Sequence, residues 1–375
     1  MSPIYLLAIT LLPFLISVTI GAIQSKKPHL LPDNPNHRSS HSHTVSRGGG
    51  IAFLLPVLIL MVYLIFFENY RTEEIIGLAA GLTAFSILGL FDDITDLSSG
   101  FRLIAQFVLA TALIFYGTSE TIVLFDYLLI EGWILRIFQI IWIVSIINFY
   151  NFMDGIDGIA ALQGLFFSLI AAVFLHADIN YLFNSDITPA EENPIFIFTA
   201  LRDGFIVLFF GLIGFLVWNR PVARLFMGDS GSYFLGFLFS YSALLLVPAA
   251  GSHPEKILSV NMIQTGHQSH FSLYLILLLP FIADPAVTLI KKIILKKPIF
   301  HAHREHYYQK LHIFGWSVLS VDLLYMIFNT ALIVPAVFYF FSKNNELHAA
   351  MGSAFIIIFF AVIAYLSHKI NKKQS

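Results

Sequence analysis

Residues 133–176 read WILRIFQIIWIVSIINFYNFMDGIDGIAALQGLFFSLIAAVFLH, and this stretch decides the fold. It holds two apolar runs, 133–149 and 158–176, on either side of a turn rich in asparagine, aspartate and glycine. About 17–25 apolar residues are enough to cross a bilayer as a helix, and runs of this kind with few charges are typical of transmembrane segments. The stretch therefore predicts two membrane-spanning helices joined by a polar loop.

The same pattern continues along all 375 residues of the chain. Apolar residues make up 57% of it and charged residues 12%, against roughly a quarter charged in a soluble domain. With no cysteine, disulfides and thiol chemistry are excluded. We expect an all-α polytopic integral membrane protein, a single membrane domain over residues 1–375, with about eleven transmembrane helices. The predicted spans are 2–23, 51–67, 74–91, 101–117, 133–149, 158–176, 203–218, 231–249, 271–293, 317–341 and 350–368.

The basic residues predict how the chain is oriented. Of the 21 lysines and arginines, sixteen fall in one set of alternate connecting segments and the tail. The positive-inside rule places that side in the cytoplasm, so the N-terminus lies outside and the C-terminus inside, as an odd number of spans requires. The first span has no basic leader and is read as a retained helix. The predicted cytoplasmic loops are about 24–49, 92–102, 148–158, 218–231 and 294–316.

Three acidic clusters fall in these cytoplasmic loops. An aspartate at the middle of a membrane helix costs roughly 2.5–3.5 kcal/mol on insertion scales, so several in one membrane protein need a shared reason. The first cluster is Asp92-Asp93 with Asp96 and Arg102. Carboxylate oxygens are hard ligands that suit Mg²⁺ or, alternatively, Mn²⁺. Mg²⁺ usually takes one or two carboxylates plus substrate phosphates. The alternative is a purely structural role, in which a solvated acidic turn caps the next helix.

The second and third clusters each open an apolar span. The second has Asp154 and Asp157 three residues apart, each followed by a glycine (Gly155 and Gly158), and the helix amides that follow favour a phosphate. A polar turn with capping residues is the alternative. The third contains Asp229, which is either an N-cap or the carboxylate that closes a metal site with Asp92 or Asp93. Other polar or aromatic candidates at these clusters are Asn148, Asn151, Asn219 and Phe226.

Two further loops carry basic or histidine residues. In the first, Arg47 precedes the glycines Gly48, Gly49 and Gly50, whose amides suit phosphate oxygens. The last large loop contains His301, His303, Arg304 and His306. Without a cysteine or a fitting carboxylate spacing, contacts to an anion or a nucleotide are favoured over zinc ligation.

Taken together, these motifs resemble those of the polyprenyl-phosphate N-acetylhexosamine-1-phosphate transferase family. The matching pieces are Asp92-Asp93 with Asp96, Asn151-Phe-Met-Asp154-Gly-Ile-Asp157-Gly158 and Phe226-Met-Gly-Asp229-Ser-Gly231-Ser, with the histidine and arginine loop in the last cytoplasmic position. The resemblance covers about residues 33–316. The loops around Arg38 and Arg47 are similar to the branch that initiates O-antigen and capsule-like glycans.

The resemblance implies a function. Such enzymes transfer a sugar 1-phosphate from a UDP-sugar to undecaprenyl phosphate and release UMP. It implies catalytic roles for Asp92, Asp93, Asp154, Asp157 and Asp229, and Mg²⁺ ligation by Asp92, Asp93 and Asp229. The implied substrate-binding residues are Arg47, Gly48, Arg102, Asn148, Asn151, Gly155, Asn219, Phe226, His301, His303, Arg304 and His306. The implied setting is a bacterial plasma membrane with the active site facing the cytoplasm.

The same residues also indicate which partners and which alternative functions are expected. The expected partners are undecaprenyl phosphate, a UDP-sugar and membrane lipid, with a homodimer as a candidate assembly, and nothing in the sequence supports a nucleic acid. Within the family, the alternative is the phospho-N-acetylmuramoyl-pentapeptide transferase reaction of peptidoglycan synthesis. Outside it, the alternative is a proton-coupled transporter, whose carboxylates would be expected near the midplane of the membrane.

Overall fold

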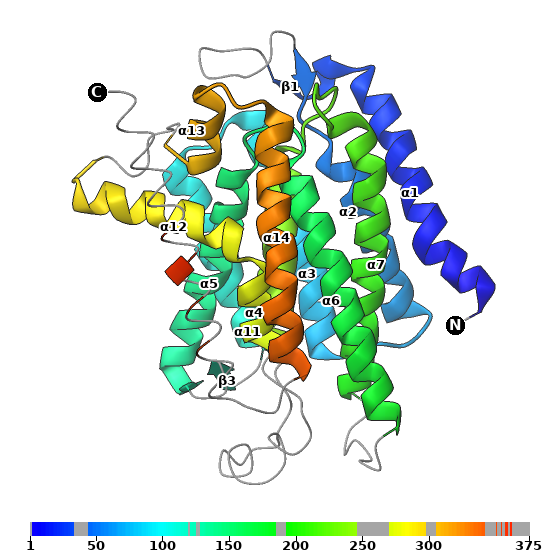
Figure 1. Ribbon diagram of the computed structural model, residues 1–375. Helices are drawn as coiled ribbons and strands as arrows, with labels where there is room; N and C mark the ends of the chain where they lie inside the picture. Colours follow the sequence, from blue (N-terminus) through cyan, green and yellow to red (C-terminus); the bar gives the residue numbers. More distant parts are fainter. Residues whose placement is uncertain are drawn as a thin grey trace. The chain divides into compact units, whose positions relative to one another are not determined.

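The computed structural model describes residues 2–33, 44–118, 121–124, 128–184, 193–245, 270–297 and 305–341, with a few positions between 350 and 361. The chain divides into two compact units, which are residues 1–122 with 130–249 and residues 123–129 with 250–375. The prediction of a single domain over 1–375 therefore stays a prediction. Both units are built almost entirely from helices (Figure 1).

The first unit carries eight long helices in its described part. They are α1 (Pro3–Ser25), α2 (Gly50–Phe66), α3 (Glu73–Thr95), α4 (Ser99–Gly117), α5 (Gly132–Met153), α6 (Ile159–Asn184), α7 (Asn193–Asn219) and α8 (Gly228–Leu245). Short elements connect them: the 3-10 helix η1 (Pro28–Leu30) and the strands β1 (Pro32–Asp33), β2 (Val45–Ser46), β3 (Thr121–Leu124) and β4 (Leu128–Glu131). β1 pairs with β2 in an antiparallel register that places Pro32 opposite Ser46.

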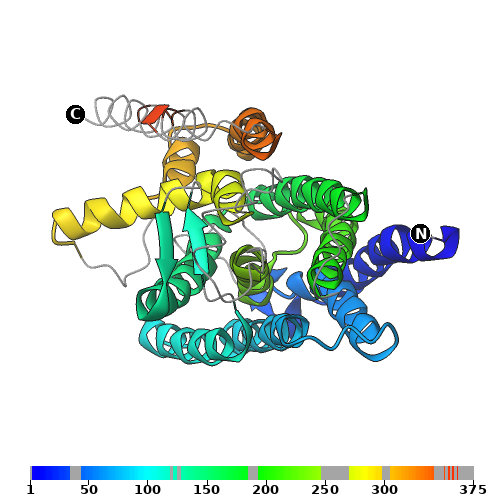
Figure 2. The same ribbon diagram turned by 90° about the horizontal axis from the view of Figure 1, so that it is seen from below.

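Helix α8 is the centre of the first unit. Figure 2 looks along it and shows most of the other helices of that unit around it, with α1 outside them, and α8 packs against α2, α3 and α5. Every residue from Ser230 to Leu245 is buried. Close approach at the start of α8 depends on glycine: a Cβ on Gly89 of α3 would come within 2.4 Å of the Asp229 carbonyl oxygen. This contact brings the end of α3 against the beginning of α8, where two of the acidic clusters meet.

The helices fit a multi-pass membrane protein. Within the described ranges, seven helices are long and apolar enough to cross a membrane, or eight if the pair α11 and α12 of the second unit, bent by 74°, counts as one span. α2 is shorter than these, and serines and tyrosines interrupt the apolar sequence of the buried helix α8. The predicted span 350–368 lies almost wholly outside the described residues. The count of eleven and the orientation therefore stay predictions.

The second unit is smaller and contains four helices in its described part. They are α11 (His270–Leu277), α12 (Leu279–Ile294), α13 (Tyr307–Ile313) and α14 (Val318–Phe341). α14 packs against α11, α12 and α13. The bend between α11 and α12 falls at Leu278, two residues before Pro280, which is accommodated in the first turn of α12.

Candidate active site

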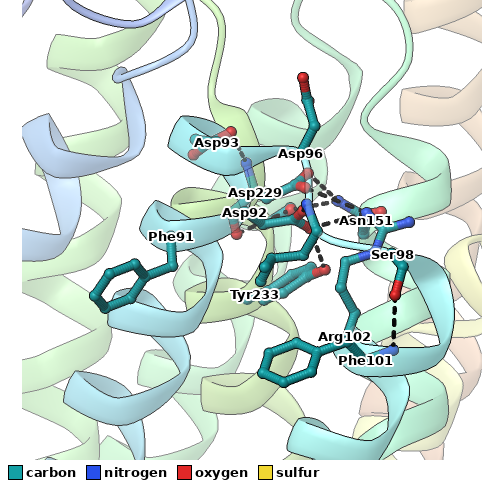
Figure 3. Close-up of polar contacts among 12 residues, drawn as sticks. Phe91, Asp92, Asp93, Asp96, Ser98, Phe101, Arg102, Asn151, Asp229 and Tyr233 are labelled. Atoms are coloured by element: carbon teal, nitrogen blue, oxygen red, sulfur yellow. Dashed lines mark hydrogen bonds and ion pairs between the residues drawn. The ribbon is translucent and has the colours of Figure 1, made fainter.

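The ends of four helices of the first unit bring polar side chains together at one place. Asp92 lies in the last turn of α3, Arg102 in the first turns of α4, Asn151 near the end of α5, and Asp229 at the start of α8. Figure 3 shows these side chains converging, whereas the exposed rings of Phe91 and Phe101 lie away from them. We call Asp92, Asp93 and Asp229 the acidic centre. The structure thus joins residues that are more than 130 positions apart in the sequence.

Asp92 is held by three donors and is 3% exposed. The Leu97 amide donates to its Oδ1 at 3.0 Å, and the Arg102 guanidinium and the Tyr233 hydroxyl donate to its Oδ2 at 2.8 and 3.0 Å. Charge-assisted bonds of this length favour a carboxylate over a carboxylic acid. The three bonds therefore fix the position of this side chain and favour its negative charge.

Asp229 shares its arginine with Asp92. Asn151 donates from Nδ2 to Asp229 Oδ1 at 2.6 Å, and the Arg102 NH1 lies 3.6 Å from Asp229 Oδ2. One guanidinium thus serves two carboxylates, which leaves the pair with an excess of negative charge.

The third member of the acidic centre plays a different part in this structure. Asp93 accepts hydrogen bonds from the backbone amides of Asp229 and Ser230, at 2.9 and 3.1 Å, and so caps the start of α8. In the part of the chain that is described, no group of three acidic, histidine or cysteine side chains is gathered as a metal would need. The predicted set Asp92, Asp93 and Asp229 is therefore not assembled as a ready-made site, because Asp93 faces the α8 amides.

Asp157 of the second acidic cluster organises the loop after α7. Its Oδ2 accepts from the Ala223 amide at 2.9 Å. The adjacent Gly158 amide donates to Asn219 Oδ1 at 3.0 Å, and Asn219 Nδ2 donates to the Leu225 carbonyl at 2.9 Å. Asn219 is 4% exposed, so its described contacts are those of a residue that shapes the loop.

Asp154 differs from Asp157 in its electrostatic setting. It follows the last residue of α5, and desolvation together with the carboxylates of Asp93 and Asp157 raises the pKa of Asp154 to about 7. Gly155, next to it, is exposed, and Phe226 in the loop before α8 is half-buried. Asn148 turns inward, with its Nδ2 donating to Gln106 Oε1 at 2.6 Å and to the Val144 carbonyl. These predicted site residues lie in the same unit as the acidic centre.

The backbone amides of the glycine loop, Gly48 to Gly50, contact other groups of the protein in this structure. The amides of Gly49 and Gly50 donate to the carbonyls of Phe226 and Met227 at 2.9 and 2.7 Å, and the Gly48 amide lies 3.3 Å from Ser46 Oγ. The Gly49 and Gly50 amides are therefore engaged by backbone carbonyls, and binding of a phosphate at Gly48 stays a prediction.

Arg47 is engaged as well, but with acidic side chains. Its NH2 lies 2.8 Å from Asp33 Oδ1 and its NH1 lies 3.4 Å from Asp96 Oδ1. Asp96 is exposed at 87%. The contact with Asp96 is therefore weak, since solvent screens it, and it links the glycine loop to the end of α3.

The predicted residues of the last loop are only partly described. His301, His303 and Arg304 lie outside the described residues. His306, in the second unit, is buried, and its Nδ1 lies 3.4 Å from Oδ1 of Asp284, a carboxylate that is fully buried. His306 is thus placed within its own unit, and its role toward a substrate stays a prediction.

Sequence reasoning missed two residues that contact the predicted site. Tyr233 donates to Asp92 from a position four residues after Asp229, so both lie on the same face of α8. Gln106 lies four residues after Arg102 and accepts from Asn148. The helical spacing was the available signal in both cases, but a tyrosine or glutamine in an apolar run does not stand out as an aspartate does.

Comparisons with known proteins find one matching family model and several relatives. Residues 75–247, which hold the acidic centre, match the family model of glycosyl transferase family 4. A probable undecaprenyl-phosphate N-acetylglucosaminyl 1-phosphate transferase of Bacillus subtilis is 27% identical over 96% of this chain and 88% of its own length. An undecaprenyl-phosphate alpha-N-acetylglucosaminyl 1-phosphate transferase of Thermotoga maritima is 28% identical over 62% of each chain. A phospho-N-acetylmuramoyl-pentapeptide-transferase of Leuconostoc citreum is 29% identical over 34% of each chain.

Proposed function

We propose that this chain, whose residues 75–247 match the glycosyl transferase family 4 model, transfers an N-acetylhexosamine 1-phosphate from a UDP-sugar to undecaprenyl phosphate. An oxygen of the lipid phosphate attacks the phosphorus that bears the sugar, and the bond from that phosphorus to UMP breaks. The products are UMP and a lipid diphosphate sugar. The relatives named for this acceptor and reaction class support the proposal.

The observation that carries the proposal is the convergence of Asp92, Asp229 and Arg102. Phosphoryl transfer needs little covalent chemistry from a protein, and depends on positioning and on neutralising charge around the phosphorus. Two carboxylates and a guanidinium at the ends of α3, α8 and α4 supply both signs of charge within one hydrogen-bonded group. A proton relay along a transport path has less support, since these carboxylates gather at helix ends.

The donor set of the acidic centre fits Mg²⁺. Asp92 and Asp229 lie side by side with one arginine between them, and a divalent cation would compensate the remaining negative charge. Two carboxylates completed by substrate phosphates and water are a usual coordination for Mg²⁺, so Asp93 is not required as a ligand. When bound, Mg²⁺ would neutralise the diphosphate and polarise the phosphorus that is attacked. Mn²⁺ would fit the same oxygen ligands.

The chain's own residues would then have separate tasks. Arg102 presents a fixed positive charge to the transferring phosphate while Tyr233 and the Leu97 amide keep Asp92 in place. Asn151 orients Asp229 through its 2.6 Å hydrogen bond. Asp154 and exposed Gly155 lie in the adjacent loop, where the uridine of the donor would bind.

The proposal extends to the setting of the enzyme. We place the acidic centre at the cytoplasmic face of a bacterial plasma membrane, with eleven spans and the N-terminus outside, because sixteen of the 21 basic residues belong to that side in the sequence. We assign the product to the initiation of O-antigen or another surface polysaccharide. The basis is the loop around Arg38 and Arg47, of which residues 34–43 lie outside the described structure.

The test is a reaction with purified protein, undecaprenyl phosphate, Mg²⁺ and a panel of UDP-N-acetylhexosamines. UMP release and the lipid product are followed by mass spectrometry. We expect a lipid diphosphate sugar that forms only with the metal and identifies the sugar. UDP-N-acetylmuramoyl pentapeptide is included, and turnover of that donor alone would assign the peptidoglycan reaction in place of the proposed one.

A negative result also has a defined meaning. If no donor yields UMP, binding of UDP is measured on the same preparation by calorimetry. A folded protein that binds no uridine nucleotide would overturn the transferase proposal.

A further inference from the structure

Tyr307, at the start of α13, is held rigidly by a buried carboxylate. The Asp284 carboxylate accepts from the Tyr307 amide at 2.9 Å, from the Tyr308 amide at 3.2 Å and from the Tyr325 hydroxyl at 2.7 Å. Asp284 is 0% exposed and Tyr307 is 3% exposed. A carboxylate with this many donors fixes the backbone at which α13 begins, and therefore fixes where the Tyr307 ring lies.

Two ammonium groups meet on this ring. Lys291 Nζ of α12 lies 4.9 Å from the ring centroid and also donates to the Tyr307 hydroxyl. Lys310 Nζ, one turn along α13, lies 5.2 Å from the same centroid. Both distances are within the range of cation–π attraction. We call Lys291, Lys310 and Tyr307 the basic cluster.

Two ammonium groups lie on the same ring at the basic cluster. Glu305 pairs with Lys297 at 3.1 Å, and the Asp284 carboxylate is occupied by the amides and the Tyr325 hydroxyl. Within the described residues Lys310 makes no ion pair with a carboxylate. Burial and the Lys291 ammonium lower the pKa of Lys310. Two like charges on one ring repel each other, and an anion with two negative charges would relieve that repulsion.

The surroundings of the basic cluster are those of a membrane surface. Helix α12 carries Lys291 and Lys292 in its last turn, and Ile290, Ile293 and Ile294 beside them are 54%, 55% and 72% exposed. A helix that mixes exposed isoleucines with lysines is typical of the boundary between headgroups and acyl chains. Lysines at that depth contact lipid phosphate groups.

We propose that the basic cluster binds a phosphate monoester carried on a membrane lipid. A monoester carries up to two negative charges, which matches the two ammonium groups, and the Tyr307 hydroxyl adds a polar contact. The identification of this lipid with the polyprenyl phosphate acceptor rests on the proposed function. The binding itself does not, since it is a property of the second unit alone.

The experiment uses the full chain in nanodiscs of neutral lipid, with undecaprenyl phosphate as the probe and native mass spectrometry as the readout. Lys310→Gln removes one charge, and Tyr307→Phe keeps the ring but removes the hydroxyl. Lys296→Gln is the matched control, because Lys296 is exposed just beyond α12 and loses the same charge. We expect Lys310→Gln to weaken binding about tenfold, Tyr307→Phe about threefold, and Lys296→Gln not at all.

Competing lipids and donor kinetics identify the source of the phosphate. Phosphatidic acid, a monoester, should displace the probe, whereas phosphatidylglycerol, a diester, should not. In the transfer reaction, Lys310→Gln should raise KM for undecaprenyl phosphate and leave KM for the UDP-sugar unchanged. A rise confined to the KM of the UDP-sugar would assign the site to the donor diphosphate and overturn the lipid proposal.

Two further outcomes separate this inference from the proposed function. Equal binding by wild type and Lys310→Gln, or equal weakening by Lys296→Gln, overturns the basic cluster as a site even if the enzyme turns over. Selective loss of lipid binding in Lys310→Gln supports it even if no sugar is transferred.

Discussion

The acidic centre of the first unit and the basic cluster of the second unit are built in opposite ways. At the acidic centre, Arg102 is shared by Asp92 and Asp229, so carboxylates outnumber cations. At the basic cluster, Lys291 and Lys310 meet on one tyrosine ring, and the Asp284 carboxylate accepts from the Tyr307 and Tyr308 amides. Each place therefore gathers one sign of charge, so a cation would relieve the repulsion at the first and an anion would relieve it at the second.

The two places also differ in what holds them. The acidic centre is held by side chains from four helices, with Asn151, Arg102 and Tyr233 as its supports. The basic cluster depends on one buried residue, Asp284, which fixes the start of α13. A substitution at the acidic centre should therefore reduce turnover more than it reduces stability. A substitution at Asp284 should mainly reduce the stability of the second unit.

The largest effect is expected from Asp229→Asn. The amide keeps the shape of the side chain but removes half of the negative charge that faces Arg102, and with it the attraction for Mg²⁺. We expect turnover to fall by at least about a hundredfold, with little change in Tm. Initial rates of UMP release measure the fall in turnover.

Glu73→Gln is the control for Asp229→Asn, because it removes a carboxylate from an exposed position at the other end of α3. Turnover within twofold of wild type is expected for the control. If both variants lost the same activity, the assignment of the site to the acidic centre would be wrong.

Asp284→Asn should produce the largest loss of stability. The amide oxygen cannot accept from two backbone amides and the Tyr325 hydroxyl as the carboxylate does, and an unpaired buried donor costs about 1–3 kcal/mol. We expect the second unit to lose about 2–4 kcal/mol and the binding of lipid phosphate to weaken with it. Hydrogen exchange of the Tyr307 and Tyr308 amides locates the effect.

Glu305→Gln provides the matched comparison for Asp284→Asn. It removes the carboxylate of the Lys297 pair, whose side chains are 35% and 49% exposed, and such pairs contribute about 0–1 kcal/mol. Exchange at Tyr307 that is equally fast in both variants would show that Asp284 is not what fixes the basic cluster.

Much of the fold could be predicted from the sequence because long apolar runs have few alternatives. Predicted spans such as 74–91 and 133–149 lie inside helices α3 and α5. The predicted span 203–218 begins ten residues after the start of α7, because the residues up to Arg202 were assigned to the preceding loop. In the structure the side chains of Arg202 and Asp203 are buried and pair with each other at 2.8 Å, which lets the helix continue through them.

The sequence predicted the candidate site less completely than it predicted the fold. Asp92, Asp229, Arg102 and Asn151 do meet, as their positions at helix ends suggested. The sequence could not show that Phe226 and Met227 supply carbonyls to the Gly49 and Gly50 amides, and phosphate binding at Gly48 stays a prediction. Tyr233 was missed for the converse reason: its hydroxyl gains a role only through the register of α8 against α3.

A smaller effect is expected from Tyr233→Phe. Asp92 keeps two of its three donors, and one hydrogen bond to a charged group contributes about 1.5 kcal/mol, so kcat should fall roughly tenfold with KM for the UDP-sugar unchanged. Tyr241→Phe is the control, because that hydroxyl donates to the Gly117 carbonyl at 3.0 Å from the same helix, two turns further on. A similar loss of kcat in both variants would mean that the effect is structural.

The smallest effect, and the one that tests charge crowding directly, is expected from Asp154→Asn. The folded protein raises the pKa of Asp154 to about 7, above its unfolded value near 4, so folding favours the protonated form. Stability is therefore full below about pH 4 and declines as the pH rises toward 7, where the carboxyl ionises beside Asp93 and Asp157. Asp154→Asn cannot ionise, so its Tm in chelator should match wild type near pH 4.5 and exceed it by a few degrees at pH 8, as a thermal scan would show.

Asp96→Asn, at an exposed position, should give the same Tm difference from wild type at both pH values. If the Tm of Asp154→Asn fell below that of wild type at pH 8, the Asp154 carboxylate would have a stabilising partner. The negative charge of the acidic clusters would then already be compensated.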